Sequence, residues 1–186
     1  ASPYQLLQDA ASSLLSPLRV SQLAALMEPT WLSAISPVFP SIADQVPDLA
    51  PLPALGPRQD QQRVWEGLSR FLTALASVAP LLLVLEDIQW ADDATLMAIP
   101  HLALGLSSSR IVLALTYRPA EARQRASVGE TLGSLDRALP VLRISLAPFE
   151  RSEAVTFVQR ALGVSSHDAR ATEFAERLQE DVGRNA

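Results

Sequence analysis

Apolar residues recur with a helical period in several parts of the chain. They predict one helix over residues 4–18 and a second, short helix that Ser21 caps and that runs to Met27. A longer helix is predicted over residues 60–78, where one face is apolar: Val64, Leu68, Phe71, Leu72 and Leu75. Two further helices are expected near the C-terminus, the first over residues 150–162 with Gly163 after it.

Two unbroken aliphatic runs predict strands instead. Leu81–Leu85 follows Pro80 and stops at two acids, and Ile111–Leu115 ends in Thr116, Tyr117 and Arg118. Parallel strands that helices cover on both faces have this continuous apolar pattern. The residues between the two runs are helix-like apart from Pro100, and residues 141–146 predict a third strand.

Seven of the fourteen prolines lie between Pro29 and Pro57. Proline removes a backbone donor and biases the preceding residue toward extended conformations, so a loop with at most short helical turns is expected here. The loop could be a flexible insertion or a polyproline docking segment. The insertion is favoured, because Val46, Leu49, Leu52 and Leu55 could lie against a core.

The two acids after the first strand, Glu86 and Asp87, suggest a ligand-binding or catalytic site. Open α/β sheets bind ligands at the carboxyl ends of their strands, and two carboxylates there can hold a hydrated Mg²⁺ and orient a water for attack on a phosphate. The same acids could instead form a solvated turn before a helix that Asp92 or Asp93 caps. Trp90 is expected to pack between sheet and helix rather than to stack on a ligand.

The amino-acid composition argues against several classes of protein. The net charge is −5 and basic residues are not clustered, which argues against direct binding of nucleic acid. The chain has no cysteine, no signal-like start and no apolar run long enough to span a bilayer, so a cytoplasmic protein is expected. Arginine without lysine, with abundant Ala, Leu and Pro, is typical of GC-rich coding and favours a bacterial source.

Three segments in a fixed order resemble the second half of a P-loop ATPase of the signal-transducing (STAND) group. LLLVLEDIQWADD resembles its Walker B block, IVLALTYRP its sensor strand, and ISLAPFERSEAVTFV the strand and helix that follow. Domains of this group occur in large LuxR-type and MalT-like transcriptional regulators. The resemblance implies an α/β fold with the three-layer parallel sheet of a P-loop NTPase.

The resemblance also implies a domain organisation. Residues 1–149 would be a partial core truncated at its N-terminus, and residues 150–186 would begin a helical lid subdomain. The core would contain the Pro-rich loop 29–57, the Walker B strand 81–87, the sensor strand 110–118 and a last strand 141–146. In relatives the strand with the phosphate loop lies between the sensor strand and the last strand. Here the last strand could close up against the sensor strand, or the gap between them could stay open; closure is favoured, because unpaired buried backbone donors are costly.

Site roles follow from the same resemblance. Glu86 and Asp87 would hold Mg²⁺ through water, and Asp87 would also polarise the attacking water. Arg118 would stabilise charge on the γ-phosphate, although it could form an ion pair with Glu86 or Asp87 instead. Thr116 could bond near the phosphates, or it could serve only as a good strand former.

The chain has no lysine and no glycine pair at GxxxxGK[ST] spacing ahead of the first strand, so it has no phosphate-binding loop. We therefore expect a fragment of an ATP-hydrolysing switch whose intact form binds ATP and Mg²⁺ through a missing N-terminal segment and self-associates. The alternative is a non-catalytic interaction scaffold that has lost the loop.

The missing lysine generates a prediction for the 186-residue chain. Isothermal titration with Mg-ATP should show no binding tighter than about millimolar, which corresponds to only ~4 kcal/mol. Micromolar affinity would contradict this expectation.

Overall fold

The computed structural model describes residues 2–12, 15, 17–46, 48–147, 149–165 and 169–184. The chain divides into two compact units, residues 1–141 and 142–186. Each unit has its own cluster of buried apolar side chains. The expected division after residue 149 lies within the second unit.

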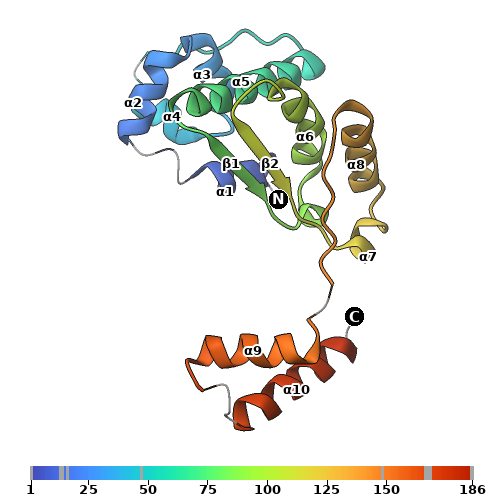
Figure 1. Ribbon diagram of the computed structural model, residues 1–186. Helices are drawn as coiled ribbons and strands as arrows, with labels where there is room; N and C mark the ends of the chain where they lie inside the picture. The colour runs from blue at the N-terminus through green and yellow to red at the C-terminus, as the bar shows by residue number, and fades with distance from the viewer. Residues whose placement is uncertain are drawn as a thin grey trace. The chain divides into compact units, whose positions relative to one another are not determined.

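Two parallel strands form the centre of the first unit (Figure 1). β1 (Leu81–Leu85) and β2 (Ile111–Leu115) coincide with the two aliphatic runs and pair in register, Leu81 beside Ile111 and Leu85 beside Leu115. A short 3-10 turn, η1 (Ile88–Trp90), and the helix α6 (Asp93–Gly105) connect them. A parallel pair needs such a crossover, because the chain must return to the starting edge of the sheet.

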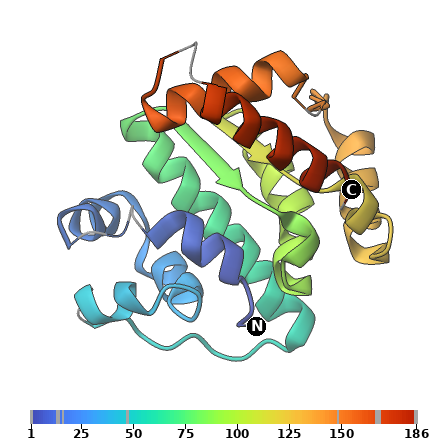
Figure 2. The ribbon, with the colours of Figure 1, turned by 90° about the horizontal axis from the view of Figure 1, so that it is seen from below.

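Helices cover one face of this pair. Leu83 of β1 lies among side chains of α1 (Gln5–Ser12), α5 (Pro57–Val78) and α6, with Phe71 of α5 fully buried beside it. Figure 2 shows α1 and α5 from below. On the opposite face Leu82 and Val112 are each 63% exposed. The sequence predicted strands covered on both faces within a three-layer sheet, whereas the described residues form a two-stranded sheet covered on one face.

The predicted third strand is not formed. Residues 141–147 are neither helix nor strand, and Leu142 and Leu146 are 86% and 91% exposed. The alternating pattern made the segment suitable for a strand, but a strand also needs a partner for its backbone hydrogen bonds. In the described part of the chain only β1 and β2 pair, so the strand expected over residues 141–146 is not formed.

The N-terminal helices differ from the prediction because proline starts helices more readily than it continues them. The helix expected over residues 4–18 is α1, and a separate α2 (Pro17–Leu26) begins at Pro17. The Pro-rich stretch contains two short helices, α3 (Pro29–Ile35) and α4 (Pro40–Gln45), each with proline in its first turn. Ile35 and Ile42 of these helices are fully buried.

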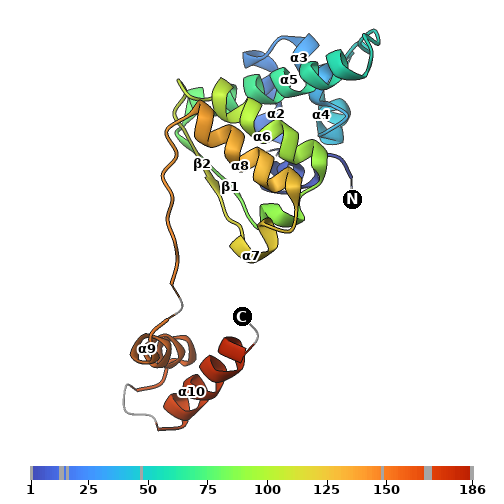
Figure 3. The same cartoon turned by 90° about the vertical axis from the view of Figure 1, so that its right-hand side faces the viewer.

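A helix that the sequence did not predict, α8 (Ala126–Ala138), packs beside α6 (Figure 3). It follows a single turn, α7 (Pro119–Ala122). Two glycines weaken the helical signal of α8. Burial of Val128 and a hydrogen bond from Thr131 Oγ1 to the Leu96 carbonyl of α6 supply tertiary stabilisation that propensity does not include.

The second unit is a pair of helices, α9 (Arg151–Leu162) and α10 (Ala169–Arg184). Glu150 and Glu153 form a capping box at the start of α9, and Gly163 ends it with a left-handed φ of 65°. The helices bury Val158 against Ala171 and Ala175, and an ion pair joins Arg151 to Glu176.

The longest helix, α5, has 22 residues and an amphipathic character. Its buried face includes Leu68 and Phe71, while Glu66 and Arg70 form an ion pair on the outside. Among the helices that the structure describes, none combines the length and the apolarity that a membrane crossing requires.

Asp92 joins the N-terminus of α1 to the N-terminus of α6. Its carboxylate caps α6 by accepting from Thr95 N at 2.9 Å and from Thr95 Oγ1 at 2.6 Å, as expected for a capping acid. It also accepts from the backbone N–H groups of Tyr4 and Gln5 at 3.0 and 3.1 Å. Burial alone would raise the pKa of Asp92, but these hydrogen bonds outweigh it and lower the pKa.

We predict that Gly67→Ala in α5 destabilises the protein, although alanine is the better helix former. A Cβ at Gly67 would lie 2.7 Å from Cγ2 of the fully buried Ile35, and overpacking of this kind costs about 1–3 kcal/mol. Gly129→Ala in α8 is the matched control, because a Cβ there meets nothing within 4 Å. It should stabilise by about 0.5–1 kcal/mol in urea unfolding. Equal effects of the two substitutions would contradict the packing at Gly67.

We predict that Asp92→Ala lowers the free energy of unfolding by about 0.5–2 kcal/mol near neutral pH, since it removes a helix cap. The pKa of Asp92 is lower in the folded state, so its stabilisation is complete above the unfolded pKa and is lost as pH falls below about 4. The gap between wild type and variant should therefore close in acid. Asp44→Ala, on an exposed position, is the control.

Candidate functional site

The parallel register brings the ends of both strands to one edge of the sheet. Thr116 N donates to the Leu85 carbonyl at 3.0 Å, and Ile88 N donates to the Thr116 carbonyl at 3.0 Å. The ladder thus continues beyond the last paired residues of β1 and β2. The predicted site residues Glu86 and Asp87, which follow β1, therefore lie at the same edge as Thr116 and Arg118, which follow β2.

Asp87 has a left-handed backbone conformation, with φ 51° and ψ 48°. This conformation is uncommon for residues other than glycine and needs support from its surroundings. Thr116 supplies part of that support, because its Oγ1 accepts from Asp87 N at 2.9 Å. The Asp87 side chain is exposed, and its Oδ1 accepts from Gln89 Nε2 at 2.9 Å.

Arg118 follows β2 and points its guanidinium at acidic side chains. Its Nε lies 3.8 Å from Asp87 Oδ1, and its Nη1 lies 3.4 Å from Glu121 Oε1. The ion pair expected with Glu86 or Asp87 is therefore made with Asp87. Because all three side chains retain solvent exposure, these ion pairs contribute little to the stability of the fold. The Arg118 guanidinium can therefore leave them to bind another anion.

Glu86 is exposed and makes no hydrogen bond or ion pair with any of the described residues. Together with Asp87 it offers carboxylate oxygens, which are the ligands that Mg²⁺ prefers. No cluster of three acidic, His or Cys side chains suited to a metal occurs among the described residues. These two acids are the residues that would hold a hydrated Mg²⁺, with water and phosphate supplying its remaining ligands.

Two residues of the site were missed at the sequence level. Gln89 is only 3% exposed and bonds to both Asp87 and Arg118. Arg125 donates through Nη1 to the carbonyls of Gln89 and Ala91, and its Nη2 lies 2.6 Å from Asp93 Oδ1. A polar residue between Ile88 and Trp90 was the available signal for Gln89, whereas nothing local distinguishes Arg125 from other arginines.

The exposure of Trp90 differs from the prediction. It was expected to pack between sheet and helix, but it is 71% exposed. The 3-10 turn explains the difference, since it directs Ile88 and Gln89 inward and leaves the third residue facing solvent. An indole thus stands exposed three residues after Asp87.

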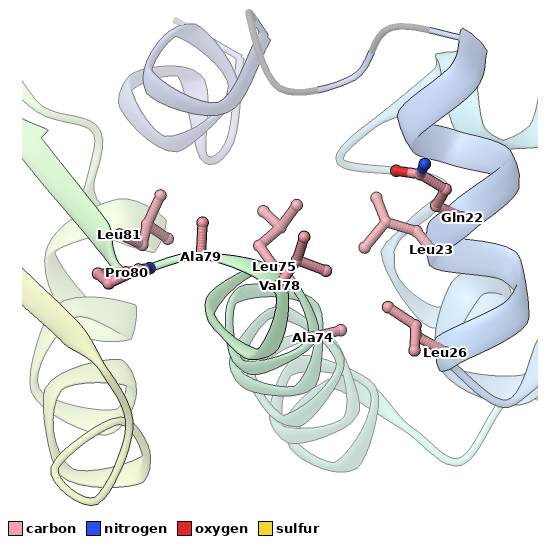
Figure 4. Close-up of a pocket in the computed structure, with 9 residues that line it drawn as sticks. All are labelled: Gln22, Leu23, Leu26, Ala74, Leu75, Val78, Ala79, Pro80 and Leu81. Atoms are coloured by element: carbon pink, nitrogen blue, oxygen red, sulfur yellow. The ribbon is translucent and has the colours of Figure 1, made fainter.

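The opposite edge of the sheet has a different character. At the amino end of β1 a cavity of about 250 Å³ lies between α2 and the end of α5. Figure 4 shows Leu23 and Leu26 of α2 facing Leu75 and Val78 of α5, with Gln22 as the one polar side chain. This cavity offers no charged side chain to a phosphate or a metal, whereas exposed acids and an arginine lie at the carboxyl edge.

For ATP itself the residues present fit only in part. Carboxylates and an arginine gather at the carboxyl edge, as a γ-phosphate with its metal would require. The sequence supplies neither a lysine nor a glycine-rich loop to enclose the other phosphates.

Comparison with known proteins gives the family to which most of the first unit is similar. The family model of the AAA ATPase domain matches residues 3–115, which include β1, Glu86, Asp87 and all of β2. No curated protein and no solved structure matches the chain. Since the matched residues make up more than half of the 186, this chain belongs to the AAA ATPase domain family.

Proposed function

We propose that the carboxyl edge of β1 and β2 is the metal-binding and water-activating part of an ATP-hydrolysing molecular switch. The observation that carries the proposal is the convergence of Asp87, Glu86 and Arg118 at one edge of a parallel pair in a chain of the AAA ATPase family. In open α/β sheets this edge is where ligands bind.

Each residue has a distinct part in the proposed chemistry. Glu86 and Asp87 would hold Mg²⁺ through water, and a bound Mg²⁺ would neutralise charge on the phosphates. Asp87 would orient the attacking water and accept its proton. Arg118 would turn from Asp87 toward the transferring phosphoryl group and oppose the negative charge that develops there.

Hydrolysis requires more than these residues. A phosphate-binding loop with its lysine must hold the nucleotide in line with the water, and the 186 residues contain no lysine. We therefore propose that the activity belongs to a longer protein that also contains such a loop, and that this chain alone is inactive. Thr116, which supports Asp87 N, could also approach the phosphates in that protein.

The resemblance to signal-transducing ATPases extends the proposal to a role. The longer protein would be a STAND-type switch in a bacterial, cytoplasmic transcriptional regulator of the LuxR group, and its nucleotide state would control self-association. The second unit, α9 and α10, would begin its lid subdomain. With a net charge of −5, this chain would not itself bind DNA.

A second candidate function rests on a separate observation. Leu82, Val84 and Val112 expose an apolar sheet face, and exposed apolar surface of this kind is typical of interaction sites. The alternative is therefore a non-catalytic scaffold that uses the sheet as a binding platform. The upstream coding sequence separates the two: an in-frame glycine-rich loop ending in Lys-Ser or Lys-Thr supports the switch.

In a protein that contains this loop, Asp87→Asn should lower kcat by about 10²- to 10⁴-fold while ATP still binds, because it removes the proton acceptor but little ground-state contact. Single-turnover hydrolysis and nucleotide titration measure the two effects separately. Asp44→Asn, an exposed acid on α4, is the control and should change neither. Unchanged turnover in the Asp87 variant would move the catalytic role elsewhere.

Arg118→Ala should reduce the preference for ATP over ADP in the same protein, since only ATP offers a γ-phosphate to the guanidinium. Titration with each nucleotide measures the ratio of the two Kd values. The control is Arg123→Ala, which removes an exposed arginine from the same segment. Equal losses for ATP and ADP at Arg118 would indicate a purely structural arginine.

A further inference from the structure

We propose that Gln89 is a positioning residue, which fixes the direction of the Asp87 carboxylate and links it to the backbone of Arg118. This inference rests on the proposed ATPase function and adds to it a residue with no direct contact with the nucleotide. One amide side chain lies between the two ends of the strands and bonds to both.

The two hydrogen bonds of Gln89 use opposite ends of its amide. Nε2 donates to Asp87 Oδ1 at 2.9 Å, and Oε1 accepts from Arg118 N at 3.2 Å. An ionised carboxylate only accepts and a backbone N–H only donates, so the reverse orientation of the amide would leave both bonds unmade. Only a side chain that donates at one end and accepts at the other can join these two groups.

Burial and anchoring make Gln89 suitable for this role. The residue is 3% exposed, so its amide is shielded from water that would otherwise replace its partners. Its backbone carbonyl accepts from Arg125 Nη1 at 3.0 Å, and Arg125 is itself paired with Asp93 at the start of α6. The backbone of Gln89 is therefore anchored, while the Asp87 carboxylate that its side chain orients faces solvent.

The link through Gln89 holds Asp87 independently of the Arg118 side chain. Arg118 and Asp87 interact directly through exposed side chains at 3.8 Å, a contact that a phosphate can replace. The bond through Gln89 uses the Arg118 backbone and does not depend on the guanidinium. Asp87 therefore keeps its orientation when the Arg118 side chain turns toward a phosphate.

The first test needs no nucleotide and uses the 186-residue chain. NMR of the side-chain amides should show slow hydrogen exchange for Gln89 and fast exchange for Gln62, which is exposed on α5. Asp87→Ala should shift the Gln89 side-chain resonances and leave those of Gln62 in place. Exchange of Gln89 as fast as that of Gln62 would overturn the inference without any reference to ATP.

The second test is a double-mutant cycle in the protein that contains the phosphate loop. Gln89→Met keeps the volume and removes both hydrogen bonds, so it should lower kcat by about 10- to 100-fold, the usual loss for a residue that orients a metal ligand. The KM for ATP should change by less than about twofold. In the Asp87→Asn background the same substitution should have little further effect on kcat, because Gln89 acts through Asp87.

The controls separate failure of this inference from failure of the proposed function. Gln62→Met should leave kcat unchanged, and Gln89→Glu, which retains an acceptor for Arg118 N but loses the donor to Asp87, should resemble Gln89→Met. An equal loss from Gln89→Met with and without Asp87 would make Gln89 a merely structural residue. If the unsubstituted protein does not hydrolyse ATP, the proposed function itself is overturned, while the exchange measurement still decides the hydrogen bonds.

Discussion

The parallel ladder between β1 and β2 is the constraint on which the first unit depends. Parallel pairing requires a crossover, and α6 supplies it by packing on the face of the sheet that Leu83 and Leu85 line. It also requires that both strands end at the same edge. Asp87 and Thr116, almost thirty positions apart, meet for this reason, and the hydrogen bond from Asp87 N to Thr116 Oγ1 joins the two strand ends.

The two edges of the sheet consequently differ in chemistry. The amino edge borders an apolar cavity lined by α2 and α5, whereas the carboxyl edge gathers exposed acids and an arginine over a buried glutamine. At the carboxyl edge the backbones of Asp87 and Gln89 are each held by a side chain, Asp87 N by Thr116 Oγ1 and the Gln89 carbonyl by Arg125 Nη1. An exposed carboxylate on a buried amide can meet solvent or substrate without losing its orientation.

Membership in the AAA ATPase domain family rests on residues 3–115, which contain both strands of the described sheet. Leu82, Val84 and Val112 leave an apolar face uncovered, although parallel sheets are ordinarily buried on both faces. Further structure on this face, from the same protein or from a partner, would remove that surface from water. The ATP-hydrolysing switch and the non-catalytic scaffold would both cover this apolar face. Only the switch would also bind and hydrolyse a nucleotide.

The sequence determined the elements whose signal is local. The aliphatic runs predicted β1 and β2, the helical period of apolar residues predicted α5, and Asp92 was recognisable as a helix cap. Each of these signals lies in residues that are close together in the sequence. Tertiary structure decided the rest. The segment 141–146 had the pattern of a strand but formed none. Trp90 faced solvent because η1 turned Ile88 and Gln89 inward. Packing against α6 stabilised α8, although two glycines lower its helix propensity. The contacts of Gln89 and Arg125 join positions about thirty residues apart, and such pairs follow from the register of a sheet, which no local pattern encodes.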